Sequence, residues 1–144
     1  MSYLDNFEHS FMQHTLKILQ AYEGLFGATI LVNCLLGLLV VPKETSLDAI
    51  PDDPLADLAK WGISPGSIKR IGKPTKANRR PDTLRGLVHN FRNSVAYFDL
   101  KPIPRTDEVH SFEFANDKIE FLAVIKLSEM REFVTRLAQY LDDH

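Results

Sequence analysis

Cysteine is nearly absent from this chain of 144 residues, since Cys34 is the only one. A single cysteine excludes an intramolecular disulfide, and Cys34 lies in an apolar stretch that is typical of a small buried hydrophobe. The N-terminal MSYLDNFEHS also lacks the basic start and the short apolar run of a secretory signal. We therefore expect a cytoplasmic protein, in keeping with the reducing conditions under which disulfide-free chains occur.

Sequence patterns for metal and cofactor chemistry are missing as well. The five histidines include no pair at the three- or four-residue helical spacing that suits metal ligands. Neither a Gly-rich phosphate loop nor a nucleophile elbow is present. A Ser-His-Asp arrangement has no fixed spacing along a chain and stays open. We expect no bound metal and no cofactor.

One long apolar run without charge is present, LFGATILVNCLLGLLVV over Leu25–Val41. A helix that spans a membrane needs about 17–25 apolar residues, so this run is at the lower limit of that range. Thr29 and Asn33 interrupt it, and Gly27 and Gly37 would let neighbouring helices approach closely. We interpret it as the buried central helix of a bundle and expect no insertion into a membrane.

The formal net charge of −2 conceals a strong local asymmetry. From Lys60 to Arg92 nine basic residues stand against one acidic residue, Asp82, so this basic block has a net charge of +8 and the rest of the chain −10. Such a block either binds the phosphates of a nucleic acid or is a basic loop that contacts only water. Six glycines and prolines between residues 62 and 81 indicate that much of it is loop, and we expect a long basic connection over about 43–81.

Hydrophobic periodicity predicts four main helices, over about 4–22, 25–41, 84–98 and 128–144. The alternating stretches HSFEF and KIEFLAVI predict a β-hairpin that turns at Asn116-Asp117. A short helix is expected over PLADLAKWGI, ending at Gly62, and another helical turn in SPGSIKRIG. The expected fold is therefore mainly α: a helical bundle of about four main helices, with a small β-hairpin before the last helix, in a single domain over residues 1–144.

The segment LRGLVHNFRNSVAYF, over Leu84–Phe98, carries the most specific pattern. At about 100° per residue its apolar residues form one stripe that faces the core: Leu84, Leu87, Val88, Phe91, Val95 and Phe98. The polar residues of the adjacent flank are Arg85, His89, Arg92 and Asn93. We expect Asp82 or Thr83 to cap this helix, and Pro102 and Pro104 to prevent its continuation. The flank is either an ordinary solvated face or a functional site.

The sequence from Arg92-Asn93 to Ala96-Tyr97 resembles the Arg-Asn-x-x-x-His signature of the HEPN superfamily, a group of helical bundles that includes metal-independent ribonucleases. The order of the elements, with NCLLGLLVVP in the second helix and a hairpin before the last, is similar to that of the pEK499-p136-like branch. This chain departs from the signature at one position, where Tyr97 stands in place of the histidine.

The resemblance implies roles for the residues of the polar flank. In HEPN ribonucleases a ribose 2′-hydroxyl attacks the neighbouring phosphate, an arginine stabilises the developing charge, an asparagine orients its neighbours and a histidine moves a proton. Arg92 and Asn93 would keep the first two roles. A phenol does not ordinarily act as a base at neutral pH, so Tyr97 would instead donate a hydrogen bond or stack on a base. His89, three residues before Arg92, is the candidate replacement for proton transfer.

The candidate RNA-binding residues are Arg79, Arg80, Arg85 and Lys76, all from the basic block.

Five residues along a helix rotate by about 140°, so Arg92 and Tyr97 do not share a face. In the HEPN family two subunits bring their motif helices to one cleft, and the resemblance therefore implies a homodimer.

Three interpretations of function stay open. The first is a dimeric RNA-directed protein, a metal-independent endoribonuclease or a relative with altered or lost catalysis, of the kind found in toxin-antitoxin and phage-defence systems. The second is a non-catalytic dimerisation module that binds a protein partner such as an antitoxin. The third is a nucleotide-binding bundle. The basic block favours the first interpretation, whereas Tyr97 favours the second over a full ribonuclease.

Overall fold

The structure, a computed structural model, describes residues 50–97, 99–105 and 108–143. Its elements in chain order are η1 (Leu55–Trp61), η2 (Pro65–Ser67), β1 (Ile68–Ile71), α4 (Leu84–Ala96), β2 (Leu100–Arg105), β3 (Glu108–Asn116), η3 (Asp117–Ile119), β4 (Phe121–Lys126) and α5 (Leu127–Asp143), where η denotes a 3-10 helix. The helices expected over 4–22 and 25–41 lie outside the described residues, as do Cys34 and Phe98.

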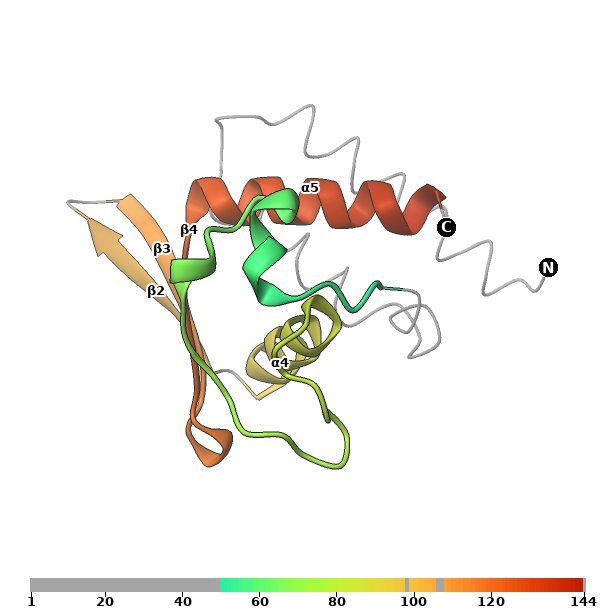
Figure 1. The fold of residues 1–144 in the computed structure, drawn as a ribbon. Coiled ribbons are helices and arrows are strands. Elements are labelled where there is room, and N and C mark those ends of the chain that lie inside the picture. Colours follow the sequence, from blue (N-terminus) through green and yellow to red (C-terminus); the bar gives the residue numbers. More distant parts are fainter. Residues whose placement is uncertain (1–49, 98, 106–107, 144) are drawn as a thin grey trace, which may run out of the picture.

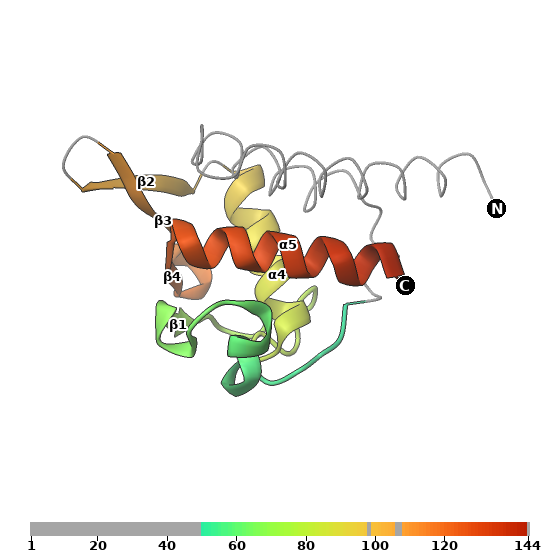
Figure 2. The same cartoon turned by 90° about the horizontal axis from the view of Figure 1, so that it is seen from above.

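The strands form one antiparallel sheet of four, in the order β1-β4-β3-β2. Both α4 and α5 lie on the same side of this sheet (Figure 1), and Figure 2 shows that α5 crosses α4. Alternate residues of the two central strands are buried under the helices: Phe112, Phe114, Phe121, Ala123 and Ile125. The core therefore lies between one face of the sheet and the two helices.

The prediction of a mainly α bundle with only a small hairpin is wrong, because the hairpin is the centre of a four-stranded sheet. The predicted pair itself is present as β3 and β4. The two edge strands gave no clear sequence signal. β1 has four residues, of which three are exposed, so no hydrophobic alternation marks it. β2 contains Pro102 and Pro104, which break helices but are tolerated in an edge strand, where a missing N–H leaves no partner unsatisfied.

The helix that carries the HEPN-like motif forms much as predicted. It begins at Leu84, and Thr83 caps it, since Thr83 Oγ1 accepts a hydrogen bond from the backbone N–H of Gly86 at 3.1 Å. The predicted apolar stripe is buried at each of its described positions, Leu84, Leu87, Val88, Phe91 and Val95. The hydrophobic spacing therefore gave the correct rotation of α4 about its axis.

Part of the connection expected over 43–81 is regular structure that packs on α5. The η1 helix ends at Gly62, as predicted, with a φ of 88°. A Cβ atom at Gly62 would lie 2.4 Å from Cβ of Glu132, so only glycine allows this approach. One turn earlier in α5, the carboxylate of Glu129 accepts hydrogen bonds from the backbone N–H of Ser64 at 2.7 Å and from the Ser67 hydroxyl at 2.8 Å.

Phe91 of α4 lies at the centre of the core. The centroid of its ring is 4.6 Å from that of Phe114 in β3, 6.2 Å from that of Phe121 in β4 and 5.8 Å from that of Phe133 in α5. Two of these pairs have the edge-to-face geometry that aromatic rings favour. One side chain thus joins the motif helix to the sheet and to the last helix.

Replacing Phe91 with alanine should lower the free energy of unfolding by about 3–5 kcal/mol, because three aromatic neighbours would face a cavity. Urea denaturation followed by circular dichroism measures this change. Phe91→Leu, which fills much of the space, is the matched control and should cost clearly less. A loss below about 1 kcal/mol for the alanine variant would contradict the central position of this ring.

Candidate functional site

A pocket of about 340 Å³ lies between α4 and the loop that precedes it. Its charged lining consists of Lys76, Arg79 and Arg80 from the loop, Arg85 and Arg92 from α4, and the single carboxylate of Asp52, and His89 of α4 lines it as well. We call this site the basic pocket. Its volume is within the range of about 300–1,000 Å³ that is typical of ligand sites.

The basic pocket brings together six of the eight predicted site residues: the four candidate RNA-binding residues together with Arg92 and His89. Asn93 and Tyr97 do not line it. Asn93 is partly exposed on α4, and Tyr97 caps the C-terminal end of the helix with 74% of its surface exposed. Tyr97 and Arg92 of the chain therefore line different hollows, in line with the rotation expected from their spacing.

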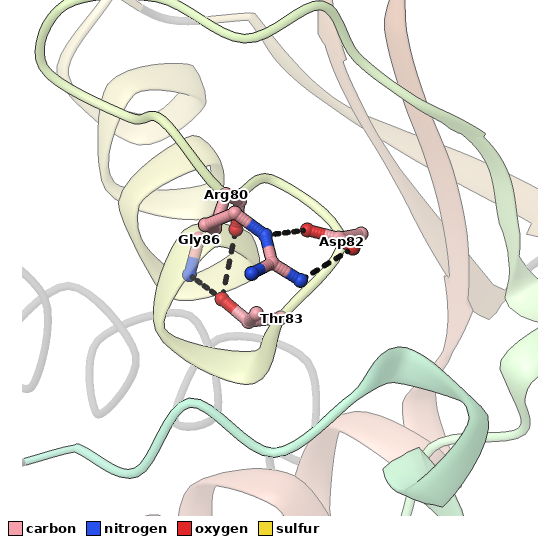
Figure 3. A network of polar contacts seen from close by, with 4 residues as sticks. All are labelled: Arg80, Asp82, Thr83 and Gly86. Carbon is pink, nitrogen blue, oxygen red and sulfur yellow. Dashed lines mark hydrogen bonds and ion pairs between the residues drawn. The ribbon is translucent and has the colours of Figure 1, made fainter.

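The loop of the basic pocket lies against α4 because residue 86 is glycine. A Cβ atom there would lie 2.2 Å from the carbonyl oxygen of Arg80 and 2.7 Å from Cα of Pro81. The cap residue Thr83 completes the contact, since its hydroxyl donates a hydrogen bond to the Arg80 carbonyl at 2.8 Å while it accepts one from the Gly86 N–H (Figure 3). The end of the loop and the start of the helix are thus one structural unit.

Two buried asparagines, which were not among the predicted site residues, hold the same loop. The Asn78 side-chain amide donates to the Gly86 carbonyl at 3.0 Å and to Asn90 Oδ1 at 3.3 Å. Asn90, which is 1% exposed, donates in turn to the Ile71 carbonyl at 3.4 Å. The sequence could have predicted the burial of Asn90, because it lies about 60° from Leu87 on the helical wheel and so borders the core stripe. We interpret both asparagines as residues that position the loop cations.

The cations of the basic pocket differ in how much of their charge is already balanced. Arg80 donates two hydrogen bonds to the carboxylate of Asp82, at 3.0 and 3.1 Å (Figure 3), and Arg85 donates one to the Ile50 carbonyl at 2.8 Å. The hydrogen bond from Arg80 holds the pKa of the exposed Asp82 carboxyl below its usual value, so this pair stays charged at neutral pH.

The other three cations of the pocket have no such partner in the described part of the chain. Neither a hydrogen bond nor an ion pair to a described residue engages the side chain of Lys76, Arg79 or Arg92. Cations gathered in one pocket repel each other, and an anionic ligand relieves this repulsion. The arrangement therefore suits a ligand with more than one negative charge, such as adjacent phosphates.

Other kinds of site find no support in residues 50–97, 99–105 and 108–143. No group of three His, Cys, Asp or Glu side chains in these ranges is placed to hold a metal ion. No helix within the same ranges is both long enough and apolar enough to cross a membrane.

A profile of the HEPN pEK499 p136 family matches residues 1–144. The chain belongs to this family. No curated protein and no solved structure matches it significantly. The predicted resemblance to the HEPN superfamily and its pEK499-p136-like branch is thereby confirmed. In this HEPN protein, α4 carries the Arg92-Asn93 pair that resembles the signature, and Arg92 lines the basic pocket.

Gly86→Ala should destabilise this HEPN protein by about 1–3 kcal/mol, the usual cost of overpacking, although alanine is the better helix former. The matched control is Gly66→Ala, because a Cβ atom at Gly66 would have no atom within 4 Å. Thermal unfolding of both variants, with amide hydrogen exchange of residues 75–80, gives the comparison. Equal stability of the two variants would show that the loop does not need its close approach to α4.

Proposed function

We propose that this HEPN protein is an RNA-directed protein that holds RNA phosphates in the basic pocket. The observation that carries the proposal is the joint lining of this pocket by Arg92 of the family motif and by the cations of the preceding loop. Arginine presents a planar fork of donors to phosphate oxygens, and clustered cations release counterions when they bind a nucleic acid. Affinity for RNA should therefore fall steeply as salt rises.

We further propose that the protein acts as a homodimer. Family membership supports an arrangement in which the motif helices of two copies line one cleft. The basic pockets of the two copies would then contact phosphates of the same RNA strand.

If the bound RNA is cleaved, the chemistry needs a proton carrier beside Arg92, and we assign this role to His89. The 2′-hydroxyl attacks the adjacent phosphorus atom, the bond from phosphorus to the 5′ oxygen breaks, and a cyclic phosphate and a 5′-hydroxyl result. Arg92 stabilises the negative charge that develops on the phosphate. His89 takes the proton of the 2′-hydroxyl, a task for which histidine is the usual residue type, and water supplies a proton to the leaving 5′ oxygen. Such an activity suits a toxin or a phage-defence protein, and an antitoxin would then be its protein partner.

The first test mixes the purified protein with a single-stranded RNA in the presence of EDTA, and measures both binding and cleavage. Arg92→Ala should lower cleavage by about 100-fold or more, as expected for the loss of one donor to the transferring group. It should also reduce the slope of log affinity against log salt by about 0.7, the value for one lost phosphate contact. The matched control is Lys60→Ala, because Lys60 belongs to the same basic block but does not line the pocket. Wild-type protein that neither binds nor cleaves RNA refutes the proposal.

A second test separates the two candidate proton carriers. His89→Ala should abolish cleavage, whereas Tyr97→Phe should leave the cleavage rate within about twofold, since only His89 lines the pocket with Arg92. RNA affinity is measured on the same variants, so that loss of binding is not mistaken for loss of chemistry. Cleavage that survives His89→Ala rules out this role. Binding without cleavage by the wild-type protein would identify a non-catalytic RNA-binding member of the family.

A further inference from the structure

A second and larger hollow, of about 710 Å³, lies on the face of the sheet that α4 and α5 do not cover. Its floor contains Ala115 of β3 and Leu122 of β4, which lie opposite one another in the strand register. These residues alternate with the buried Phe114 and Phe121, so they point away from α4 and α5. We call this site the open-face hollow, because neither of the described α-helices lies on this side of the sheet (Figure 1).

Tyr97 is the most exposed large hydrophobic side chain of the described residues and lines the open-face hollow. It enters from the end of α4, and Asp99 and Lys101 follow at alternate positions as the chain runs into β2. A tyrosine ring with 74% exposure gains little from burial within its own chain. Such a ring is available to stack on a flat partner, and its hydroxyl stays in contact with water.

The charged residues that line the open-face hollow with Tyr97 are balanced in sign. They are Arg70, Lys101 and Lys118 together with Asp99, Glu113 and Asp117. None of these six side chains has a hydrogen bond or an ion pair with a residue that the structure describes. A chain of phosphates alone would be repelled by the three carboxylates. A nucleobase with its phosphate has N–H donors for the carboxylates, a flat face for the tyrosine ring and a negative charge for the cations. It therefore complements each kind of group in the hollow.

We propose that the open-face hollow binds an unpaired nucleobase of single-stranded RNA. The ring of Tyr97 stacks on the base, the carboxylates of Asp99 and Glu113 accept hydrogen bonds from its N–H groups, and Arg70 contacts the attached phosphate. Exposed aromatic rings recognise single strands in this way, because bases in a duplex are already stacked on each other. This assignment rests on the proposed RNA-directed function but places a separate contact outside the basic pocket.

A second copy of the chain is the other occupant to consider for an open sheet face. The cores of homodimer interfaces are apolar and depleted in charge, since burying charges without partners is costly. The open-face hollow instead has six such charged side chains and only Ala115 and Leu122 as apolar floor. Its charge pattern therefore favours the nucleobase.

The test measures fluorescence anisotropy of a labelled eight-nucleotide single-stranded RNA and of the same sequence as a duplex. Tyr97→Ala should weaken binding of the single strand by about 10-fold, within the range for the loss of one base stack. Binding of the duplex should change by less than about twofold, and Tyr97→Phe should bind as the wild type does. The control is Ile71→Ala, which removes the second exposed large hydrophobic side chain of the described residues but does not alter the hollow.

The outcomes separate this assignment from the proposed function. If the wild-type protein binds no RNA, both fail. If it binds RNA, and Arg92→Ala weakens binding while Tyr97→Ala does not, only the open-face hollow is overturned. Sedimentation of each variant adds a further criterion: a dimer that dissociates on Tyr97→Ala with unchanged RNA affinity identifies a protein interface and overturns the nucleobase assignment. Circular dichroism verifies that each variant is folded, and Arg70→Gln is measured as a second variant of the same site.

Discussion

The burial of Phe91 determines the direction of the candidate site residues on α4. Its ring contacts aromatic residues of the sheet and of α5, so the helix cannot rotate about its axis without losing contacts on several sides at once. With Phe91 facing inward, the next residue, Arg92, lies about 100° away and borders the basic pocket. The same rotation directs Asn90 and Ser94 into buried positions, where their side chains hydrogen-bond to nearby backbone carbonyls. The core thus sets the geometry of the polar flank.

The basic pocket also depends on the contact between α4 and the loop that precedes it. Lys76 and Arg79 lie in a segment with no regular structure. Their charges add to that of Arg92 in one pocket only if this segment is held against α4. The close approach at Gly86 and the buried amide of Asn78 hold it there. Because the loop directly precedes the helix, the pocket is assembled from residues near in sequence, and its cations meet without a long-range rearrangement.

This local character explains which parts of the molecule the sequence predicted. Periodicity predicted α4, its cap and its buried stripe, since those features depend on residues within a few turns of each other. Charge and motif spacing indicated six of the residues that meet in the basic pocket. The fold class was wrong for two reasons. β1 is stabilised by pairing with β4, a partner far along the chain that no local pattern reveals. β2 pairs with the adjacent β3, but its two prolines are residues that strands usually lack, so its sequence did not indicate a strand. Asn78 was not predicted either, because its role depends on its hydrogen bonds to Gly86 and Asn90 in the folded chain, which no local pattern indicates.

The prolines of β2 have a consequence for how copies of this protein associate. An edge strand offers unpaired backbone groups to a strand of another molecule, but Pro102 and Pro104 remove two N–H donors from that edge. At the other edge, β1 is short and its register with β4 is interrupted between Ile68 and Arg70. Neither end of the sheet is a good template for a further strand. Self-association through a continuous intermolecular sheet, and the fibrous aggregation that begins in this way, is therefore disfavoured at both edges.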